Sequence, residues 1–344
     1  MNVPLWAWAL TIVGLIAIIV IDLIIVDHPG SKKTDGPKEF TLKQATRWVL
    51  IYVALAVLFG LGLLLFAGPR TGGEFFAGYL TEYSLSVDNL FIFYLIMARF
   101  AVPKRYQHEV LLVGIVIALI MRGMFIAVGA TALNRFSWLF YIFGVFLLYT
   151  AWNTYRDARK KAAGEEEEYE ENLMLRMMRR VLPSTDEYHG AKLTIKNDGR
   201  RLVTPMLIVM IAIGTTDLMF ALDSIPAIFG LTQDAYIVFT ANAFALMGLR
   251  QLYFLLGGLM ERLVYISYGL TVILAFIGVK LILHAMHEGG IHVPDVNIWV
   301  SLGVIIGTMV VTTVASLMRS RKDRRNGADE EPAGVGGGTA STED

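Results

Sequence analysis

The chain has 344 residues, of which 55% are hydrophobic and only 17% are charged, and its formal net charge at pH 7 is zero. Soluble globular proteins carry about 25% charged residues, so this composition predicts a protein embedded in a lipid bilayer. A chain without a basic excess is not expected to bind nucleic acid, because it has nothing to neutralise the phosphates. The sequence also contains no cysteine, which excludes disulfides, thiolate metal ligands and cysteine nucleophiles.

Apolar stretches of the length that a helix needs to cross a bilayer recur along the chain. They predict an all-α polytopic membrane protein with about nine transmembrane helices, at 5–26, 46–67, 75–97, 109–132, 136–152, 205–228, 235–256, 263–285 and 297–318. The first stretch is too long for a signal-peptide core and no basic residues precede it, so we expect it to be retained. The transmembrane domain is expected to cover residues 1–318, with a disordered cytoplasmic tail at 319–344.

Lysine and arginine residues are distributed unevenly among the connections between these spans. They are abundant in the segments 28–47, 98–108 and 153–204 and in the tail, whereas the loops predicted on the other side carry only Arg70 and Arg135. Because basic loops stay in the cytoplasm, this pattern predicts an outer N-terminus and an inner C-terminus. The long connection 153–204 is then a cytoplasmic loop, and the protein is expected in the inner (plasma) membrane.

An acidic motif occurs twice in the predicted spans, at Glu82–Asp88 and at Asp217–Asp223. In each copy two acidic residues flank five mainly apolar residues, and a small polar residue follows. One arginine then lies inside the next span of each copy, Arg122 in the first and Arg250 in the second. Two acidic matches and two matching arginines favour an internal repeat over coincidence.

The matches define two three-helix units, a first repeat at 75–152 and a second repeat at 205–285. Each unit contains an odd number of spans, so the second repeat begins on the opposite side of the membrane from the first. Inverted three-helix repeats are a transporter architecture, in which the substrate site lies near the bilayer midplane where the repeats meet. The sequence therefore predicts a site between the two acidic motifs.

Charged residues inside the predicted spans cost roughly 2.5–3.5 kcal/mol each if they stand alone in the hydrocarbon. We therefore expect them to face one another. They are the acids Glu82, Asp88, Asp217 and Asp223 and the counter-charges Arg122, Arg250 and Lys280. Structural ion pairs that fix helix packing are one interpretation. The acids outnumber the bases, however, and a divalent cation or a shared proton would balance the excess.

The donor groups near these acids suit a hard cation. Besides the four carboxylates, the predicted metal ligands are Asn89, Ser224 and Asn242. Oxygen donors of this kind favour Mg²⁺, Ca²⁺ or Mn²⁺ over Cu⁺ and Zn²⁺.

The six-residue spacing within each motif restricts the geometry of the site. Residues six apart lie about 9 Å apart along a helix and roughly 120° apart around it, so a straight helix cannot aim both at one ion. One solution is a break in the helix, for which Pro226 offers a place. In the other, each repeat contributes mainly its second acid. We expect Asp88 and Asp223 to lie nearest the pseudo-twofold axis, with Glu82 and Asp217 as flanking ligands or gates.

These motifs resemble those of the TerC/Alx family of membrane proteins. The resemblance covers roughly residues 20–318 and rests on the segments 82–91, 102–106, 122–123, 217–227, 241–245 and 248–250. It implies a fold related to the LysE-type transporters and activity as a manganese exporter. The family is also linked to tellurium resistance and to metal loading of secreted enzymes. The resemblance further implies that Glu82, Asp88, Asp217 and Asp223 are the ion-binding acids.

We therefore expect a divalent cation exporter with Mn²⁺ as transported substrate, proton coupling, no permanent cofactor and no enzymatic activity. Two alternatives are a transporter of tellurite or another oxyanion, and a non-transporting partner of the secretion machinery that loads metal into secreted enzymes. An intramembrane aspartyl protease built on Asp88 and Asp223 is disfavoured, because the residues around them do not fit its signatures. The sequence leaves open the ion selectivity, the coupling ion, homo-oligomer formation, and the roles of the acidic segment 165–171 and of the outer histidines.

Overall fold

The computed structural model describes residues 3–27, 42–163, 188, 192–197, 200–256, 265–294 and 296–329. The helices are α1 (Leu5–Asp27), α2 (Leu42–Phe66), α3 (Pro69–Arg99), α4 (Lys104–Arg135), α5 (Leu139–Ala162), α7 (Pro205–Phe229), α8 (Ala235–Met247), α9 (Leu249–Leu256), α10 (Ile266–Glu288) and α11 (Ile298–Asp329). The strands are β1 (Thr194–Asn197) and β2 (Arg200–Val203). The acidic segment 165–171 lies outside the described residues.

A helix coincides with every predicted span, with α8 and α9 together covering the seventh. Among the described residues, six helical stretches are long and apolar enough to cross a membrane, namely α2, α4, α7, α8 with α9, α10 and α11. The helices α3 and α5 carry more polar residues and are not among the six, and the apolar part of α1 is shorter. The protein is therefore polytopic and almost entirely helical, while the count of nine spans, their orientation and the inverted repeat stay predictions.

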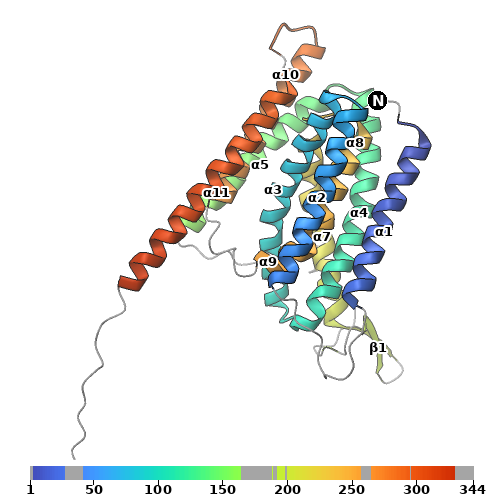
Figure 1. Ribbon diagram of the computed structural model, residues 1–344, viewed down its shortest axis with the longest axis vertical. Coiled ribbons are helices and arrows are strands. Elements are labelled where there is room, and N and C mark those ends of the chain that lie inside the picture. Colours follow the sequence, from blue (N-terminus) through green and yellow to red (C-terminus); the bar gives the residue numbers. More distant parts are fainter. Residues whose placement is uncertain are drawn as a thin grey trace, which may run out of the picture.

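The helices form a bundle and a diverging arm (Figure 1). In the bundle, α3 packs along α8 and α4 packs along α7, while α3 also contacts α7 and α2. The arm consists of α5, α10 and α11, which meet the bundle near its upper end and lean away from it toward the lower end (Figure 1). The long helix α3 contacts both parts, so it connects the arm to the bundle.

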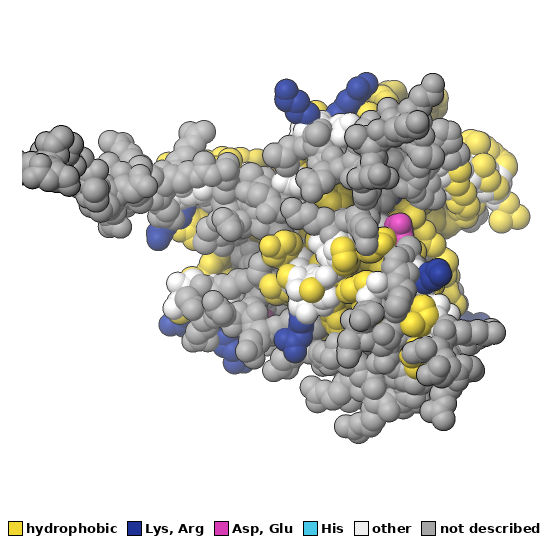
Figure 2. Space-filling view, turned by 90° about the horizontal axis from the view of Figure 1, so that it is seen from below, with side chains coloured by type: hydrophobic (Ala, Val, Ile, Leu, Met, Phe, Trp, Pro, Cys, Tyr) yellow, Lys and Arg dark blue, Asp and Glu magenta, His cyan; other side chains and the backbone are white. Residues whose placement is uncertain are grey.

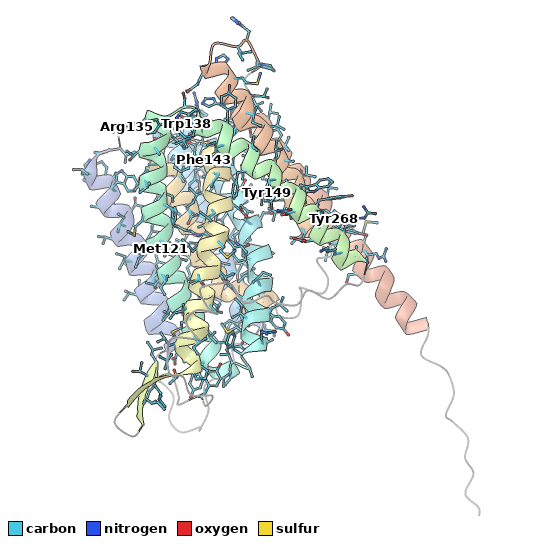
Figure 3. The ribbon with its side chains drawn as sticks, turned by 180° about the vertical axis from the view of Figure 1, so that it is seen from behind. Met121, Arg135, Trp138, Phe143, Tyr149 and Tyr268 are labelled. Atoms are coloured by element: carbon cyan, nitrogen blue, oxygen red, sulfur yellow. The ribbon has the colours of Figure 1, made fainter. Side chains whose placement is uncertain are left out.

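The pairing of α5 with α10 is antiparallel and very close. The ring of Phe140 lies 5.0 Å from that of His284, and the ring of Tyr155 lies 6.1 Å from that of Tyr268. Between these contacts the backbones approach so closely that a Cβ atom on Gly144 would lie 2.9 Å from the Gly278 carbonyl oxygen. The absence of side chains at this crossing therefore allows the two helices to touch. Figure 3 shows the arm from behind, with Tyr149 and Tyr268 on it.

Apolar side chains fill the contacts between the helices in three clusters. One joins α5, α7 and α10, with Leu147, Phe229 and Ile277 at its centre. A second joins α3, α4 and the first half of α7, and a third joins α2, α3 and α8 around Phe75 and Phe244. The middle of α7 runs between these clusters, and its polar residues are therefore enclosed by apolar packing.

The expectation of an all-α fold is corrected by a small hairpin in the connection between α5 and α7. The strands β1 and β2 pair antiparallel, with Asn197 opposite Arg200. Asp198 and Gly199 between the strands lie outside the described residues, and in sequence an Asp-Gly pair is typical of a two-residue hairpin turn. The predicted loop 153–204 is thus partly structured, since α5 also continues to Ala162.

The last helix is longer than the sequence predicts. The helix α11 runs to Asp329, well past the predicted end of the last span at residue 318. Its final part is rich in arginine and lysine, which are favourable residues in a helix. The first part of the predicted tail 319–344 is therefore helical, and residues 330–344 lie outside the described residues.

The close approach of α5 and α10 can be tested with Gly144→Ala. The new methyl group would lie 2.6 Å from Ile282 Cγ1 as well as close to the Gly278 backbone, so the helices must separate. We expect a loss of about 1–3 kcal/mol in the free energy of unfolding, seen as a lower melting temperature in detergent. The control is Gly307→Ala in α11, because a Cβ atom there meets nothing within 4 Å. Equal melting temperatures for the two variants would contradict this packing.

Candidate functional site

Three charged side chains from three helices meet inside the bundle. They are Glu82 on α3, Arg122 on α4 and Asp217 on α7, with relative exposures of 0%, 1% and 4%. Arg122 donates from Nε and Nη2 to the two carboxylate oxygens of Asp217, at 3.2 and 3.1 Å. Its Nη1 atom donates to Glu82 Oε1 and, at 3.2 Å, to the Ser224 hydroxyl. One guanidinium group is therefore shared by two carboxylates that lie far apart in the sequence.

The contacts of Arg122 stabilise the folded protein, because they pair charges that are buried in its interior. A guanidinium group presents its donors in a planar fork, which matches the two oxygens of a carboxylate, and Asp217 uses that match fully. Removal of one partner from a buried ion pair typically costs about 3–5 kcal/mol, because the other charge is left uncompensated. With Glu82 and Asp217 both ionised, the cluster has one more negative than positive charge. A proton or another cation is needed to balance it.

Further buried polar atoms lie on α3 and α8 near this cluster. Within the described residues, Glu82 Oε2, Thr81 Oγ1, Ser86 Oγ and Asn242 Nδ2 have no hydrogen-bond partner. Ser86 follows Glu82 by four residues and so lies on the same face of α3. Asn242 belongs to α8, which packs against α3. Such uncommitted polar atoms are costly in an apolar interior, and they are available to a proton, a water molecule or an ion.

The second acid of the α7 motif lies apart from this cluster. Asp223 is partly buried and accepts a hydrogen bond from Thr150 of α5 at 3.2 Å. The helix α7 is continuous from Pro205 to Phe229, so it has no break at Pro226. On an unbroken helix, residues six positions apart lie roughly 120° apart around the axis, so Asp217 and Asp223 face different sides of α7. Asp217 therefore faces Arg122, while Asp223 faces the arm.

The structure locates the other predicted site residues in several places. Asp88 lies on α3, but its side chain is outside the described part of the structure, so its proposed pairing with Asp223 stays a prediction. Asn89 on α3 and Arg250 on α9 are buried, with exposures of 9% and 2%. Lys280 on α10 donates to the Ser301 hydroxyl of α11 at 3.1 Å. Within the described residues, no group of three or more acidic or histidine side chains is arranged to hold a metal ion.

Three hydroxyl residues of the site are not among the residues that the sequence predicts for it. One is Thr150, although a hydroxyl group in an apolar span is a usable signal because it seeks a hydrogen-bond partner. Thr81 and Ser86 flank Glu82 and share its buried surroundings. Their positions, one residue before and four residues after Glu82, place them on or beside the same helical face. This spacing is the signal in the sequence that connects Thr81 and Ser86 with Glu82.

The role of Arg122 in holding the cluster together can be tested by Arg122→Gln. This change leaves two carboxylates buried without the cation that they share, and we expect the free energy of unfolding to fall by about 3–5 kcal/mol. The matched control is Arg135→Gln at the exposed end of the same helix (Figure 3), which should change stability by about 0.5 kcal/mol or less.

A charge-free cluster separates this effect from a loss of packing. Arg122→Met combined with Glu82→Gln and Asp217→Asn removes all three charges, and thermal unfolding in detergent should show partial recovery. If Arg122→Gln and Arg135→Gln were equally stable, the cluster would not hold the three helices.

Relatives of this chain are found across distant bacteria. An uncharacterized membrane protein of Mycobacterium tuberculosis (strain ATCC 25618 / H37Rv) is 44% identical over 328 residues, covering 93% of this chain and 81% of the relative. An uncharacterized membrane protein of Myxococcus xanthus is 41% identical over 287 residues, covering 83% and 86%. The Escherichia coli (strain K12) protein named "Putative membrane-bound redox modulator Alx" is 36% identical over 303 residues, covering 85% and 90%. No solved structure matches the chain.

The family described as "Integral membrane protein TerC family" matches residues 67–324. This range contains both acidic motifs and both buried arginines, so the charge cluster lies within the part that the family shares. The match agrees with the apolar helices in assigning a multi-pass integral membrane protein. The chain therefore belongs to the TerC family of integral membrane proteins.

Proposed function

We propose that this protein carries divalent cations out of the cytoplasm through the plasma membrane, with Mn²⁺ as its principal substrate. The observation that carries the proposal is the convergence of Glu82 and Asp217 on Arg122 in the apolar interior. Ionisable groups at such depth are expensive, and in membrane proteins they mark ion and proton pathways.

The donor atoms of the cluster suit the proposed substrate. Glu82 and Asp217 offer carboxylate oxygens, and Ser224 already lies within hydrogen-bond distance of Arg122. The amide of Asn242 can present its oxygen as well as its nitrogen, since the two orientations fill the same space. Hard oxygen donors are preferred by Mn²⁺, Mg²⁺ and Ca²⁺. The choice of Mn²⁺ within this class follows the family resemblance of the motifs.

Arg122 gives the cluster a simple means of exchange. The two carboxylates together carry two negative charges, which one divalent cation balances. The guanidinium group of Arg122 balances only one of these charges, so a proton must balance the other. Exchange of the divalent cation for the guanidinium group and one proton therefore keeps the buried cluster neutral in both states. In this mechanism Arg122 withdraws when the cation binds to Glu82 and Asp217, and it returns with a proton when the cation leaves.

The contacts between the helices support the inverted repeat that this mechanism requires. In the predicted repeat, α3, α4 and α5 correspond to α7, α8 and α10. The contact of α3 with α8 then corresponds to that of α7 with α4, and both are extensive. Because α5 corresponds to α10, a two-fold axis exchanges these two helices, and their pairing is the contact expected at such an axis. Glu82 and Arg122 come from the first repeat and Asp217 from the second, so the cluster lies between the repeats, where transporters of this type bind their substrate.

The distribution of charge supports an orientation with the N-terminus outside. The described N-terminus and the β-hairpin lie at opposite ends of the bundle (Figure 1). Lysine and arginine side chains surround the end that carries the hairpin (Figure 2). Basic residues favour the cytoplasmic side, so this end is assigned to the cytoplasm and the opposite end to the exterior.

Two other substrates or activities have less support. An oxyanion such as tellurite would have to approach two carboxylates, and the guanidinium group that could attract it is occupied by Glu82 and Asp217. A redox role, as in the name of the Escherichia coli relative, could not use thiol chemistry in this chain, because its sequence contains no cysteine.

Transport can be tested with the purified protein in proteoliposomes. We expect Mn²⁺ flux, and we expect Glu82→Gln and Asp217→Asn to lower it by roughly tenfold or more, since each removes a ligand of the cation in the membrane interior. The control is Asp157→Asn, which changes an exposed acid on α5 in the same way and should leave the flux unchanged. Folded protein without flux of Mn²⁺, Ca²⁺ or Mg²⁺ would overturn the proposal and favour a non-transporting partner role.

Proton coupling is a separate prediction. If a cation exchanges for Arg122 and a proton, each Mn²⁺ that leaves one side is accompanied by proton movement in the opposite direction. A pH-sensitive dye inside the vesicles should therefore report a change when Mn²⁺ is added, and Asp217→Asn should lower the Mn²⁺ flux and the proton signal by the same factor. Mn²⁺ flux without proton movement would contradict the exchange mechanism while leaving the substrate assignment intact.

A further inference from the structure

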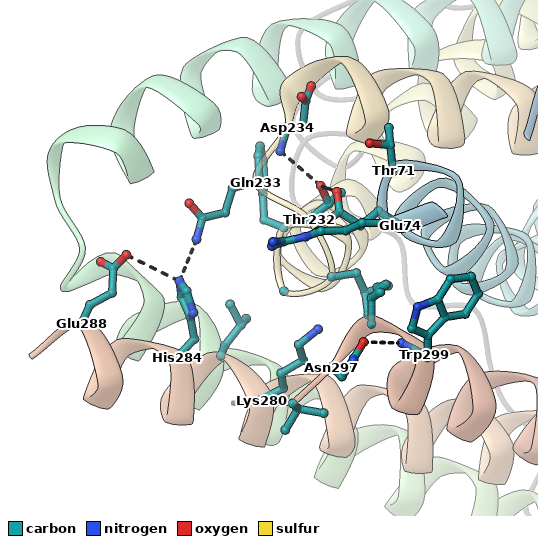
Figure 4. Close-up of a pocket in the computed structure, with 17 residues that line it drawn as sticks. Thr71, Glu74, Thr232, Gln233, Asp234, Lys280, His284, Glu288, Asn297 and Trp299 are labelled. Atoms are coloured by element: carbon teal, nitrogen blue, oxygen red, sulfur yellow. Dashed lines mark hydrogen bonds and ion pairs between the residues drawn. The ribbon is translucent and has the colours of Figure 1, made fainter. Parts of the chain in front are cut away.

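A cavity of about 870 Å³ opens at the end of the molecule that is assigned to the exterior. It lies between the start of α3, the connection from α7 to α8, the end of α10 and the start of α11 (Figure 4). We call it the outer pocket. The segments from α3, α7 and α8 belong to the bundle, and those from α10 and α11 belong to the arm. The pocket therefore lies where the bundle and the arm meet.

The lining of the outer pocket is polar and carries an excess of acidic groups. Its ionisable residues are Arg70, Glu74, Asp234, Lys280, His284 and Glu288. Glu74 accepts hydrogen bonds from Arg70 at 2.9 Å and from Thr232 at 2.6 Å. A hydrogen bond of 2.7 Å joins Gln233 to His284, and Glu288 lies 3.6 Å from the same ring (Figure 4). Three carboxylates face two permanent cations, so the pocket suits water and hydrated cations better than an apolar ligand.

The helix α7 connects the floor of this pocket to the buried charge cluster. Phe229 lines the pocket and follows Ser224, the residue that contacts Arg122, by five positions. Five residues correspond to about 7.5 Å along a helix axis. The cluster and the pocket are therefore separated by little more than one turn of α7.

The separating layer consists of Ile228, Phe229 and Leu231, with exposures of 0%, 2% and 5%. A Cβ atom on Gly129 of α4 would lie 3.1 Å from the Phe229 ring, and one on Gly230 would lie 2.5 Å from Ile277 of α10. The end of α7 thus packs closely against both α4 and α10. We call these three residues the apolar layer.

Pro226 lies between the cluster and the apolar layer. Proline has no backbone N–H, so it cannot donate the helical hydrogen bond to Leu222, and the turn from Leu222 to Pro226 lacks this bond. The final turn of α7 can therefore move relative to the part of the helix that carries Asp217 and Ser224. A displacement at this point would shift Phe229, which lies three residues beyond Pro226.

We infer that the outer pocket is the outward vestibule of the transport pathway, which receives the hydrated divalent cation, and that the apolar layer is its gate. The inference rests on the proposed function for the identity of the cation. The polar walls, which carry one more carboxylate than permanent cations, keep the released cation hydrated. The apolar layer keeps the buried cluster dry while the gate is closed. Opening of the gate moves the final turn of α7 away from α4 and α10.

The natural absence of cysteine allows a direct test, because any introduced thiol is the only one in the full chain. Gln233→Cys reports on the pocket, and Ser224→Cys and Ala221→Cys report on the region beneath the layer. A membrane-impermeant thiol reagent is applied to the outside of intact cells. We expect rapid labelling of Gln233→Cys and slow labelling of both deeper reporters.

Opening the gate by mutation should expose the deeper reporters. Phe229→Ala, added to each of them, removes the ring that fills the layer and should raise their labelling rate roughly tenfold or more. The matched control is Phe244→Ala, which removes a similarly buried ring from the cluster of α2, α3 and α8 and should have no such effect. Ser224→Cys and Ala221→Cys each report independently on access to the region beneath the apolar layer. If one of these variants misfolds, the other still tests the gate.

Several outcomes would overturn the inference. Labelling of Gln233→Cys from the cytoplasmic side alone would show that the pocket does not face outward. Rapid labelling of the deeper reporters without Phe229→Ala, or an equal effect of Phe244→Ala, would show that the apolar layer is not a gate. Labelling as expected without Mn²⁺ flux in proteoliposomes would instead overturn the proposed cation, while leaving the vestibule and its gate in place.

Discussion

Charges enclosed in an apolar bundle must be satisfied by one another, and in this protein Arg122 satisfies that requirement for two helices at once. Its guanidinium fork binds Asp217 on α7 with two hydrogen bonds and Glu82 on α3 with a third. The helices α3, α4 and α7 therefore meet at one polar point among apolar clusters. The cost of an unpaired charge in this environment is large, so the position of these helices depends on the cluster.

In the proposed mechanism the same interaction connects stability with transport. While Arg122 lies between the two carboxylates it occupies the place that a cation would take, so the substrate must replace a contact that holds the helices together. Such a site has two arrangements that balance the same charge, one with the guanidinium group and a proton, and one with a divalent cation. In that mechanism the contact between the two predicted repeats is bistable, which suits alternating access because each state favours a different packing of the surrounding helices.

The helix α7 sets the order of events along the proposed pathway. It carries Asp217 and Ser224 at the cluster, Pro226 beyond them, and Phe229 at the floor of the outer pocket. Asp223 faces Thr150 on the arm instead, which makes α5 part of the same system. Relatives of this chain in Mycobacterium tuberculosis and Myxococcus xanthus are uncharacterized, so a tested mechanism for one member would bear on a family found in distant bacteria.

The membrane class, the positions of the helices and the two acidic motifs can be predicted from the sequence, because hydrophobic length and the cost of buried charge are local properties. The Asp198-Gly199 pair also carried the signal of the hairpin, although the long polar loop obscured it. Only the tertiary structure decided that Glu82 joins Asp217 at Arg122 while Asp223 turns to Thr150. The reason is that the six-residue spacing restricts which acids can share a site, but the choice between them depends on which neighbouring helices pack against each face.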